Sequence, residues 1–78
     1  MEEVKEIKFE IVRKLGIISD AGRAWRKELN LVAWNDREPK LDIREWNEEH
    51  TRMGRGVTLT RDEGGKLHEY LGNYLRSK

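Results

Sequence analysis

The sequence predicts an α+β fold, with a four-stranded antiparallel sheet followed by one C-terminal helix. Apolar and polar residues alternate through most of the chain in short segments separated by turn residues, which is typical of half-buried strands. After residue 60 the apolar residues recur every three or four positions instead, as in an amphipathic helix. We therefore expect one domain over residues 1–78, with the sheet at 8–60 and the helix at 61–76.

The composition limits both the core and the kinds of site. The chain has 78 residues, of which 36% are hydrophobic and 40% charged, with a formal net charge of +1 and no cysteine. So small and polar a chain builds only a marginal core, which favours a core shared by two copies. The absence of cysteine excludes disulfides and thiolate metal sites. A basic surface can arise only if the fold sorts the charges between its faces.

Neither a membrane span nor a signal peptide is recognisable in the sequence. We therefore expect a protein of the cytoplasm, associated with the nucleoid. The polar segment 1–6 is expected to form a flexible arm. No pattern indicates a cofactor.

The first expected strand, Lys8–Ile18, has alternating apolar residues whose pattern slips near Leu15 and Gly16. Such a slip is typical of a β-bulge. A helix is an alternative for the first half of this segment. A turn is expected over Ser19–Gly22.

Two further strands are expected at Trp25–Asn35 and Lys40–Trp46, joined by a turn over residues 35–38. Because side chains alternate between faces, Leu41 and Ile43 lie on one face of the second of these strands. The other face then carries Lys40, Asp42, Arg44 and Trp46. In the first of them, Trp25, Lys27, Leu29 and Leu31 share one face, and Arg26 and Trp34 share the other.

A loop over residues 47–56 leads to a short fourth strand, Val57–Thr60, with Val57 and Leu59 expected to point inward. Thr60 and Glu63 have the spacing of a capping box, so the helix begins there. We expect the helix to cover one face of the sheet and to leave the other for a partner. Its apolar stripe, expected as core and dimer interface, comprises Leu67, Tyr70, Leu71, Tyr74 and Leu75.

The main functional signal is a set of tryptophans and cations on one expected face: Trp34, Lys40, Arg44 and Trp46. Aromatic rings stack on the bases of single-stranded nucleic acid, and lysine and arginine neutralise its phosphates. The pattern is equally compatible with tryptophans that fill a core. Trp25 is the tryptophan expected to be structural. Arg52 and Arg55, in a glycine-containing loop, are a weaker signal, because such loops are often only solvated.

No pattern of an enzyme or a metal site is recognisable. His50 and His68 lack partners at metal-ligand spacing, and we expect both at the surface. Four carboxylates could be grouped as an acid/base cluster, but nothing predicts a pocket around them: Asp42, Glu45, Glu48 and Glu49. The pairing of Asp42 with Arg44 is better explained as a charge network that orients the arginine.

The segments "LDIREW" (Leu41–Trp46) and "GRGVTLT" (Gly54–Thr60), followed by a helix, resemble the transcriptional positive cofactor 4 family of single-stranded-DNA-binding coactivators. The segment "GRAWRKELNLVAWND" is similar to the compact bacterial branch of that family. The resemblance covers about Lys8 to Leu75. It implies a homodimer with the helices at its centre, whose curved sheets hold single strands with little sequence preference.

By position, the resemblance assigns Trp34 and Trp46 to the stacking aromatics of the family. Its basic contacts would be Arg26, Lys27, Lys40, Arg44, Arg52 and Arg55. The leading hypothesis is thus a homodimer that binds single-stranded DNA and acts in transcription or DNA maintenance, without catalysis. RNA stays open as the ligand, and RNA polymerase or transcription factors as further partners. The alternative is a protein-interaction module of the transcription machinery, with incidental nucleic-acid binding; a small hydrolase has little support.

Overall fold

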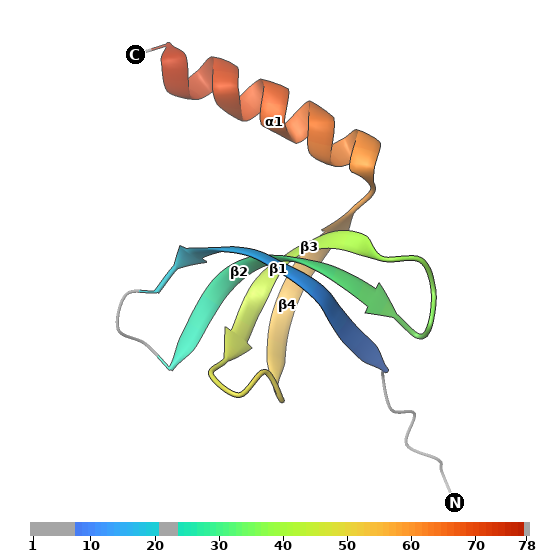
Figure 1. The fold of residues 1–78 in the computed structure, drawn as a ribbon. Helices are drawn as coiled ribbons and strands as arrows, with labels where there is room; N and C mark the ends of the chain where they lie inside the picture. Colours follow the sequence, from blue (N-terminus) through green and yellow to red (C-terminus); the bar gives the residue numbers. More distant parts are fainter. Residues whose placement is uncertain (1–7, 21–23, 78) are drawn as a thin grey trace, which may run out of the picture.

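The structure, a computed structural model, describes residues 8–20 and 24–77. The expected arm at 1–6 and part of the expected turn Ser19–Gly22 lie outside these residues. Four strands precede one helix (Figure 1): β1 Phe9–Ser19, β2 Trp25–Trp34, β3 Lys40–Asn47, β4 Met53–Leu59 and α1 Arg61–Arg76. The predicted α+β fold is confirmed.

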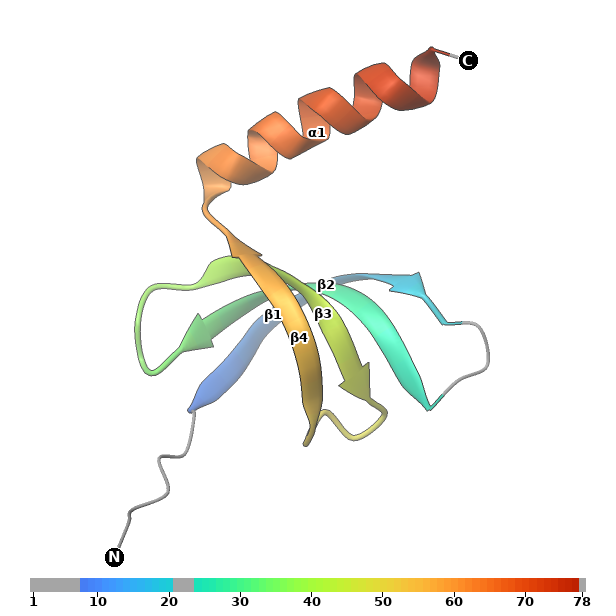
Figure 2. The ribbon, with the colours of Figure 1, turned by 180° about the vertical axis from the view of Figure 1, so that it is seen from behind.

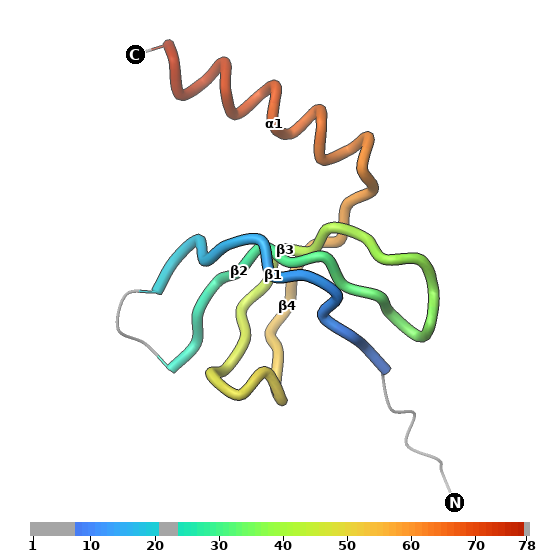
Figure 3. Tube along the Cα trace, viewed as in Figure 1, coloured from blue at the N-terminus to red at the C-terminus, as the bar shows by residue number. Residues whose placement is uncertain are grey.

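The sheet follows chain order, β1-β2-β3-β4, and each strand is antiparallel to the next. It is strongly arched (Figure 3). The helical alternative for the first segment is wrong, because β1 is a strand throughout. Its pairing with β2 shifts register three times, and the shift between Lys14 and Gly16 is the one predicted near Leu15. Bulges bend a strand and increase its twist, so these shifts contribute to the arch.

The fourth strand begins earlier than predicted. β4 starts at Met53, so Gly54 and Gly56 belong to the strand and not to the loop before it. Gly56 pairs with Arg44, and a Cβ at this glycine would overlap Arg44 Cβ and the carbonyl oxygen of Ile43. Only glycine therefore allows β4 to approach β3 this closely.

The predicted capping box forms at the start of α1. The Thr60 hydroxyl accepts a hydrogen bond from the Glu63 amide at 3.1 Å, and the Glu63 carboxylate accepts one from the Thr60 amide at 2.8 Å. Thr60 is extended, with φ −76° and ψ 170°, and it alone links β4 to α1. So short and extended a link does not turn the helix back over the sheet.

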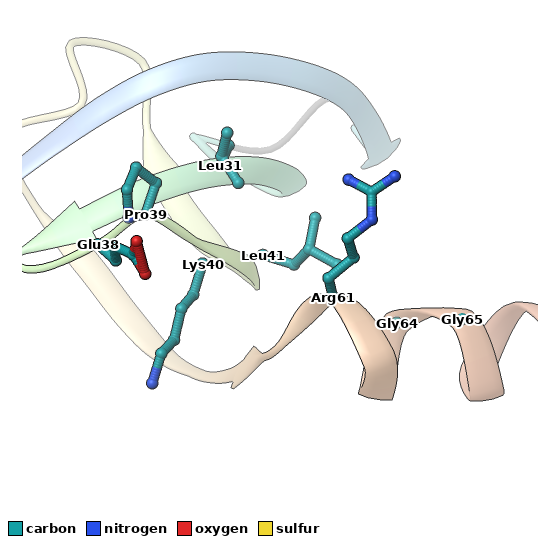
Figure 4. Close-up of a pocket in the computed structure, with 8 residues that line it drawn as sticks. All are labelled: Leu31, Glu38, Pro39, Lys40, Leu41, Arg61, Gly64 and Gly65. Carbon is teal, nitrogen blue, oxygen red and sulfur yellow. The ribbon is translucent and has the colours of Figure 1, made fainter.

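The helix covers neither face of the sheet, which corrects our expectation. Both views show α1 running away from the sheet on its convex side (Figures 1 and 2). Only its first turn lies close to the sheet, where Gly64 faces Leu41 (Figure 4). None of its residues is buried. Among the described residues, no helix has the length and apolar character that a membrane crossing needs.

The interior lies on the concave face of the sheet. The apolar residues that are fully buried there are Val32 and Trp46, and three polar side chains are buried beside them: Glu28, Asn30 and Asp42. Most aliphatic residues of β2, β3 and β4 occupy the convex face, on the side of α1. Val57, expected to point inward, is 48% exposed on that face. An arched sheet crowds the side chains on its concave face and spreads those on its convex face, which explains this reversal.

We expect Gly56→Ala to lower the free energy of unfolding by about 1–3 kcal/mol, because a backbone carbonyl must shift to admit the methyl group. Gly16→Ala is the control, since nothing lies within 4 Å of the Cβ position there. Urea denaturation of both variants measures the difference. Equal stabilities would show that the close approach of β3 and β4 is not required.

Candidate nucleic-acid interface

Four rings pack together on the concave face: Phe9, Trp34, Trp46 and His50. The register of β1 and β2 places Phe9 opposite Trp34, with ring centroids 6.1 Å apart. The centroid of Phe9 lies 5.1 Å from that of Trp46, which lies 5.6 Å from the His50 ring. We refer to these four residues as the aromatic cluster.

Trp46 is the structural tryptophan of the chain. Its side chain is 0% exposed beneath Phe9 and His50, so the ring does not reach a base in this conformation. The expectation that Trp25 has this role is therefore wrong; Trp25 is only half-buried, on the other face. Trp34 is also half-buried and is the tryptophan of the concave face that retains exposed surface.

Arg44 is held in one orientation by a buried carboxylate. Its Nε and Nη2 donate to the two oxygens of Asp42 at 2.7 and 2.8 Å, which is a bidentate pair. Its Nη1 donates to the carbonyl oxygen of Gly54 at 3.3 Å. The hydroxyl of Thr58 donates to Asp42 at 3.2 Å. The predicted charge network that orients the arginine is therefore present.

The fixed guanidinium covers the Trp34 ring. Its central carbon lies 4.8 Å from the ring centroid, within the range of a cation–π interaction. A guanidinium is planar and stacks on flat rings. Arg44 and Trp34 together therefore form an aromatic, cationic surface, which we call the stacking surface.

His50 is not at the surface, contrary to our expectation. Its side chain is 16% exposed, and its Nε2 lies 2.9 Å from Glu28 Oε1 and 3.1 Å from Oε2. The amide of Asn30 donates to Glu28 Oε1 at 3.1 Å, and Arg26 Nε lies 3.8 Å from Oε2. Burial alone would raise the pKa of Glu28, but these three neighbours lower it below its ordinary value of 4.5.

The turn between β3 and β4 is organised by Asn47. Its side-chain oxygen accepts hydrogen bonds from the amides of Thr51 and Arg52 at 2.9 and 2.8 Å. His50 has a left-handed backbone, with φ 59°, within this turn. The turn thus places His50 against Trp46 and leaves the side chain of Arg52 exposed.

The structure separates the predicted basic residues between two faces. Arg26, Lys40 and Arg44 lie at concave positions, opposite Trp46, Val32 and Glu28 in the register of β2 and β3. Figure 4 shows that Lys40 extends away from Leu31 and Leu41 of the convex face.

Lys27 and Arg55 lie elsewhere. They line a shallow hollow together with Ile43 and Val57, on the convex side. The resemblance grouped them with Arg26 as basic contacts, but they do not share the face of Arg26, as the alternation in the sequence already predicted for Lys27. The reason is the pleat, since adjacent residues such as Arg26 and Lys27 must point to opposite faces.

Several residues of the concave face were not singled out from the sequence. Lys14 pairs with Asn30 and is exposed, so it adds a cation to this face, and Phe9 adds a ring. The alternation in β1 does not reveal them, because the register shifts change which residues share a face. Glu28 and His50 are 22 positions apart, and only the fold shows that they meet.

The acidic residues do not form a metal-binding group in residues 8–20 and 24–77. No cluster of histidine and carboxylate side chains in these ranges could hold a metal ion. Asp42 is bound to Arg44, while Glu48 and Glu49 are exposed in the turn after β3.

The fold and this site define a small antiparallel-sheet protein with one aromatic, cationic face and one apolar face. The sequence profile of the family described as Transcriptional Coactivator p15 (PC4) matches residues 22–70. A protein of Treponema pallidum (strain Nichols), described as uncharacterized, is 42% identical over 65 residues, which are 83% of this chain and 76% of that protein. The chain belongs to the Transcriptional Coactivator p15 (PC4) family, as the resemblance implied.

The lowered pKa of Glu28 predicts a specific sensitivity to acid. The folded state favours the ionised carboxylate of Glu28. The contribution of this carboxylate to the free energy of unfolding is therefore complete above pH 4.5, and it is lost as the pH falls through the lower pKa of the folded state. We expect the wild type to lose more unfolding free energy than Glu28→Gln between neutral pH and pH values below 4.5. Urea denaturation across this range measures it.

Glu45→Gln, at a convex position of β3 opposite Lys27, is the control and should follow the wild type. The same acid sensitivity in the wild type and in Glu28→Gln would contradict the role assigned to the Glu28 network.

Proposed function

We propose that this protein binds single-stranded nucleic acid, chiefly DNA, along the concave face of its sheet. The observation that carries the proposal is the guanidinium of Arg44, held over the Trp34 ring by Asp42. Membership of a family described as transcriptional coactivators supports it. A base stacks on such a surface through its ring face, which every base has, so the binding has little sequence preference.

Cations on either side of the stacking surface support phosphate contacts. Arg26 lies near the start of β2, and Lys14 and Lys40 lie on the strands to either side of it, opposite Asn30 and Val32. Arg52 extends from the turn after β3. Each cation that meets a phosphate releases counterions, so the affinity falls as salt rises. The net charge of the chain is only +1, and it is this arrangement on one face that concentrates positive charge.

In this proposal Arg44 has a different role from the one expected from the sequence. Three of its nitrogens are already bound to Asp42 and Gly54, and its side chain is 14% exposed. It therefore supports a base and contributes charge, while exposed cations contact the phosphates. Trp46 supports the same surface from below, through Phe9, which contacts both tryptophans.

The proposal includes a homodimer formed through the helix and the convex face. The apolar stripe of α1 is exposed in the single chain, up to 76% at Tyr74. A helix of 16 residues with three glycines is marginal without packing. A hollow of about 670 Å³ lies between its first turn and the sheet (Figure 4).

Charge along the helix favours an antiparallel arrangement of two copies. Asp62 and Glu63 lie in the first turn and Arg76 in the last, so antiparallel helices bring opposite charges together. A second copy would also cover the leucines of the convex face. The same proposal includes a role as a coactivator or regulator of transcription, or in DNA maintenance. It also includes a location in the cytoplasm, with the nucleoid.

Titration with oligothymidine tests the nucleic-acid proposal. We expect the single strand to quench tryptophan fluorescence, a duplex of equal length to bind more weakly, and Trp34→Ala to weaken binding by about tenfold. Arg26→Ala should reduce the slope of log affinity against log salt by about 0.7, the contribution of one phosphate contact to a single strand.

Lys27→Ala is the matched control, because Lys27 neighbours Arg26 but lies on the convex face. Its slope should equal that of the wild type. If the wild type did not bind oligothymidine at all, the result would instead support the alternative of a protein-interaction module, in which the concave face binds a protein partner.

For the dimer, we expect the wild type to have twice the mass of one chain in light scattering after size exclusion. Leu71→Glu places a charge in the apolar stripe and should yield monomers with less helix in circular dichroism. Asn73→Glu adds the same charge beside the stripe, where it can still accept the hydrogen bond from Arg76, and should stay dimeric. Dimers of both variants would place the interface elsewhere.

A further inference from the structure

A polar hollow of about 320 Å³ lies on the concave face, beside the stacking surface but separate from it. It lies between β1, the first half of β2 and the turn after β3. Its lining residues are Lys14, Leu15, Gly16, Ile17, Arg26, Glu28, Asn30 and His50. Neither stacking on Trp34 nor simple phosphate contacts require so specific a set of side chains.

The floor of the hollow presents a buried carboxylate. Glu28 Oε1 accepts from Asn30 at 3.1 Å and lies 2.9 Å from His50 Nε2. Its Oε2 lies 3.1 Å from the same ring nitrogen and 3.8 Å from Arg26 Nε. Each carboxylate oxygen accepts about two hydrogen bonds, so Oε2 can accept a further donor. The side chain is 5% exposed, toward the hollow that it lines.

The walls and rim have a different character. Leu15 and Ile17 are exposed aliphatic residues of β1. Between them, the backbone of Gly16 also lines the hollow. Lys14 and Arg26 add positive charge. An acceptor floor, apolar walls and a cationic rim match the polar edge, flat faces and phosphate of one nucleotide.

The geometry points to a base-reading subsite, in which Glu28 accepts hydrogen bonds from the edge of one nucleobase of a bound strand. This inference rests on the proposed single-strand binding and adds a selectivity to it. Guanine, cytosine and adenine each carry an exocyclic amino group that can donate to the open position on Oε2. Thymine instead places carbonyl oxygens beside its N3–H, and these repel the carboxylate.

The test uses the complete chain and a short oligothymidine in which one central thymine is replaced by guanine, cytosine or adenine. We expect the strands with guanine, cytosine or adenine to bind at least about fivefold more tightly than oligothymidine, as one hydrogen bond to a charged acceptor provides. Glu28→Gln, which removes the charge of the acceptor and can turn its own amide donors toward the base, should abolish the preference while still binding oligothymidine. Glu45→Gln, at a convex position, should retain the preference of the wild type.

Equal affinity of the wild type for all four strands would overturn the inference and leave single-strand binding intact. Failure to bind any strand would overturn the proposed function itself. The wild-type series decides the matter even if Glu28→Gln does not fold. Deoxyguanosine monophosphate, added as a competitor, distinguishes a base of a bound strand from a free nucleotide. If the monophosphate bound as tightly as the strand, the hollow would be a site for free nucleotides, and the strand-bound subsite would be overturned.

Discussion

The structure depends on the packing of Trp46 between Phe9 and His50. This contact joins the start of β1, the end of β3 and the turn after it, which are far apart along the chain. Burying so large a ring on one face requires the sheet to close around it, and the register shifts of β1 allow the sheet to bend. The same bend crowds the polar side chains of β2 and β3 into the interior. The concave face is consequently a surface of fixed, mutually bonded groups, while the convex face is a spread layer of aliphatic side chains.

Buried charges need partners, and here their partners make the surface of the site. Asp42 is fully buried, and removing a carboxylate from water is costly unless it is paired. The bidentate bond to Arg44 neutralises it and at the same time fixes the guanidinium against Trp34. Glu28 is likewise held by Asn30, His50 and Arg26, and its contact with His50 fixes the turn that carries Arg52. A ligand that meets these groups finds them already ordered, so little side-chain entropy is lost on binding.

Much of the fold could be predicted from the sequence, because its signals are local. The alternation in β2 and β3, the capping box at Thr60 and Glu63, and the pairing of Asp42 with Arg44 each involve residues within a few positions of one another. The face that forms the interior could not be predicted. The aliphatic residues suggested the convex face, whereas curvature makes the concave face the interior. The long-range contact of Glu28 with His50 left no sequence pattern, and so the surface position expected for His50 was wrong.

The two faces also explain how so short a chain can have a polar interior and still adopt an ordered fold. Val32 and Trp46 alone among the apolar residues of the described chain are fully buried, so hydrophobic burial within one copy is small. The apolar surface that could add stability lies instead on α1 and on the convex face, opposite the site. Covering it with a second copy, as proposed, would hold the sheet in its arched form without occupying the concave face. Since the stacking surface exists only while β3 and β4 stay close at Gly56, dimerisation and strand binding would then stabilise the same curvature from opposite sides.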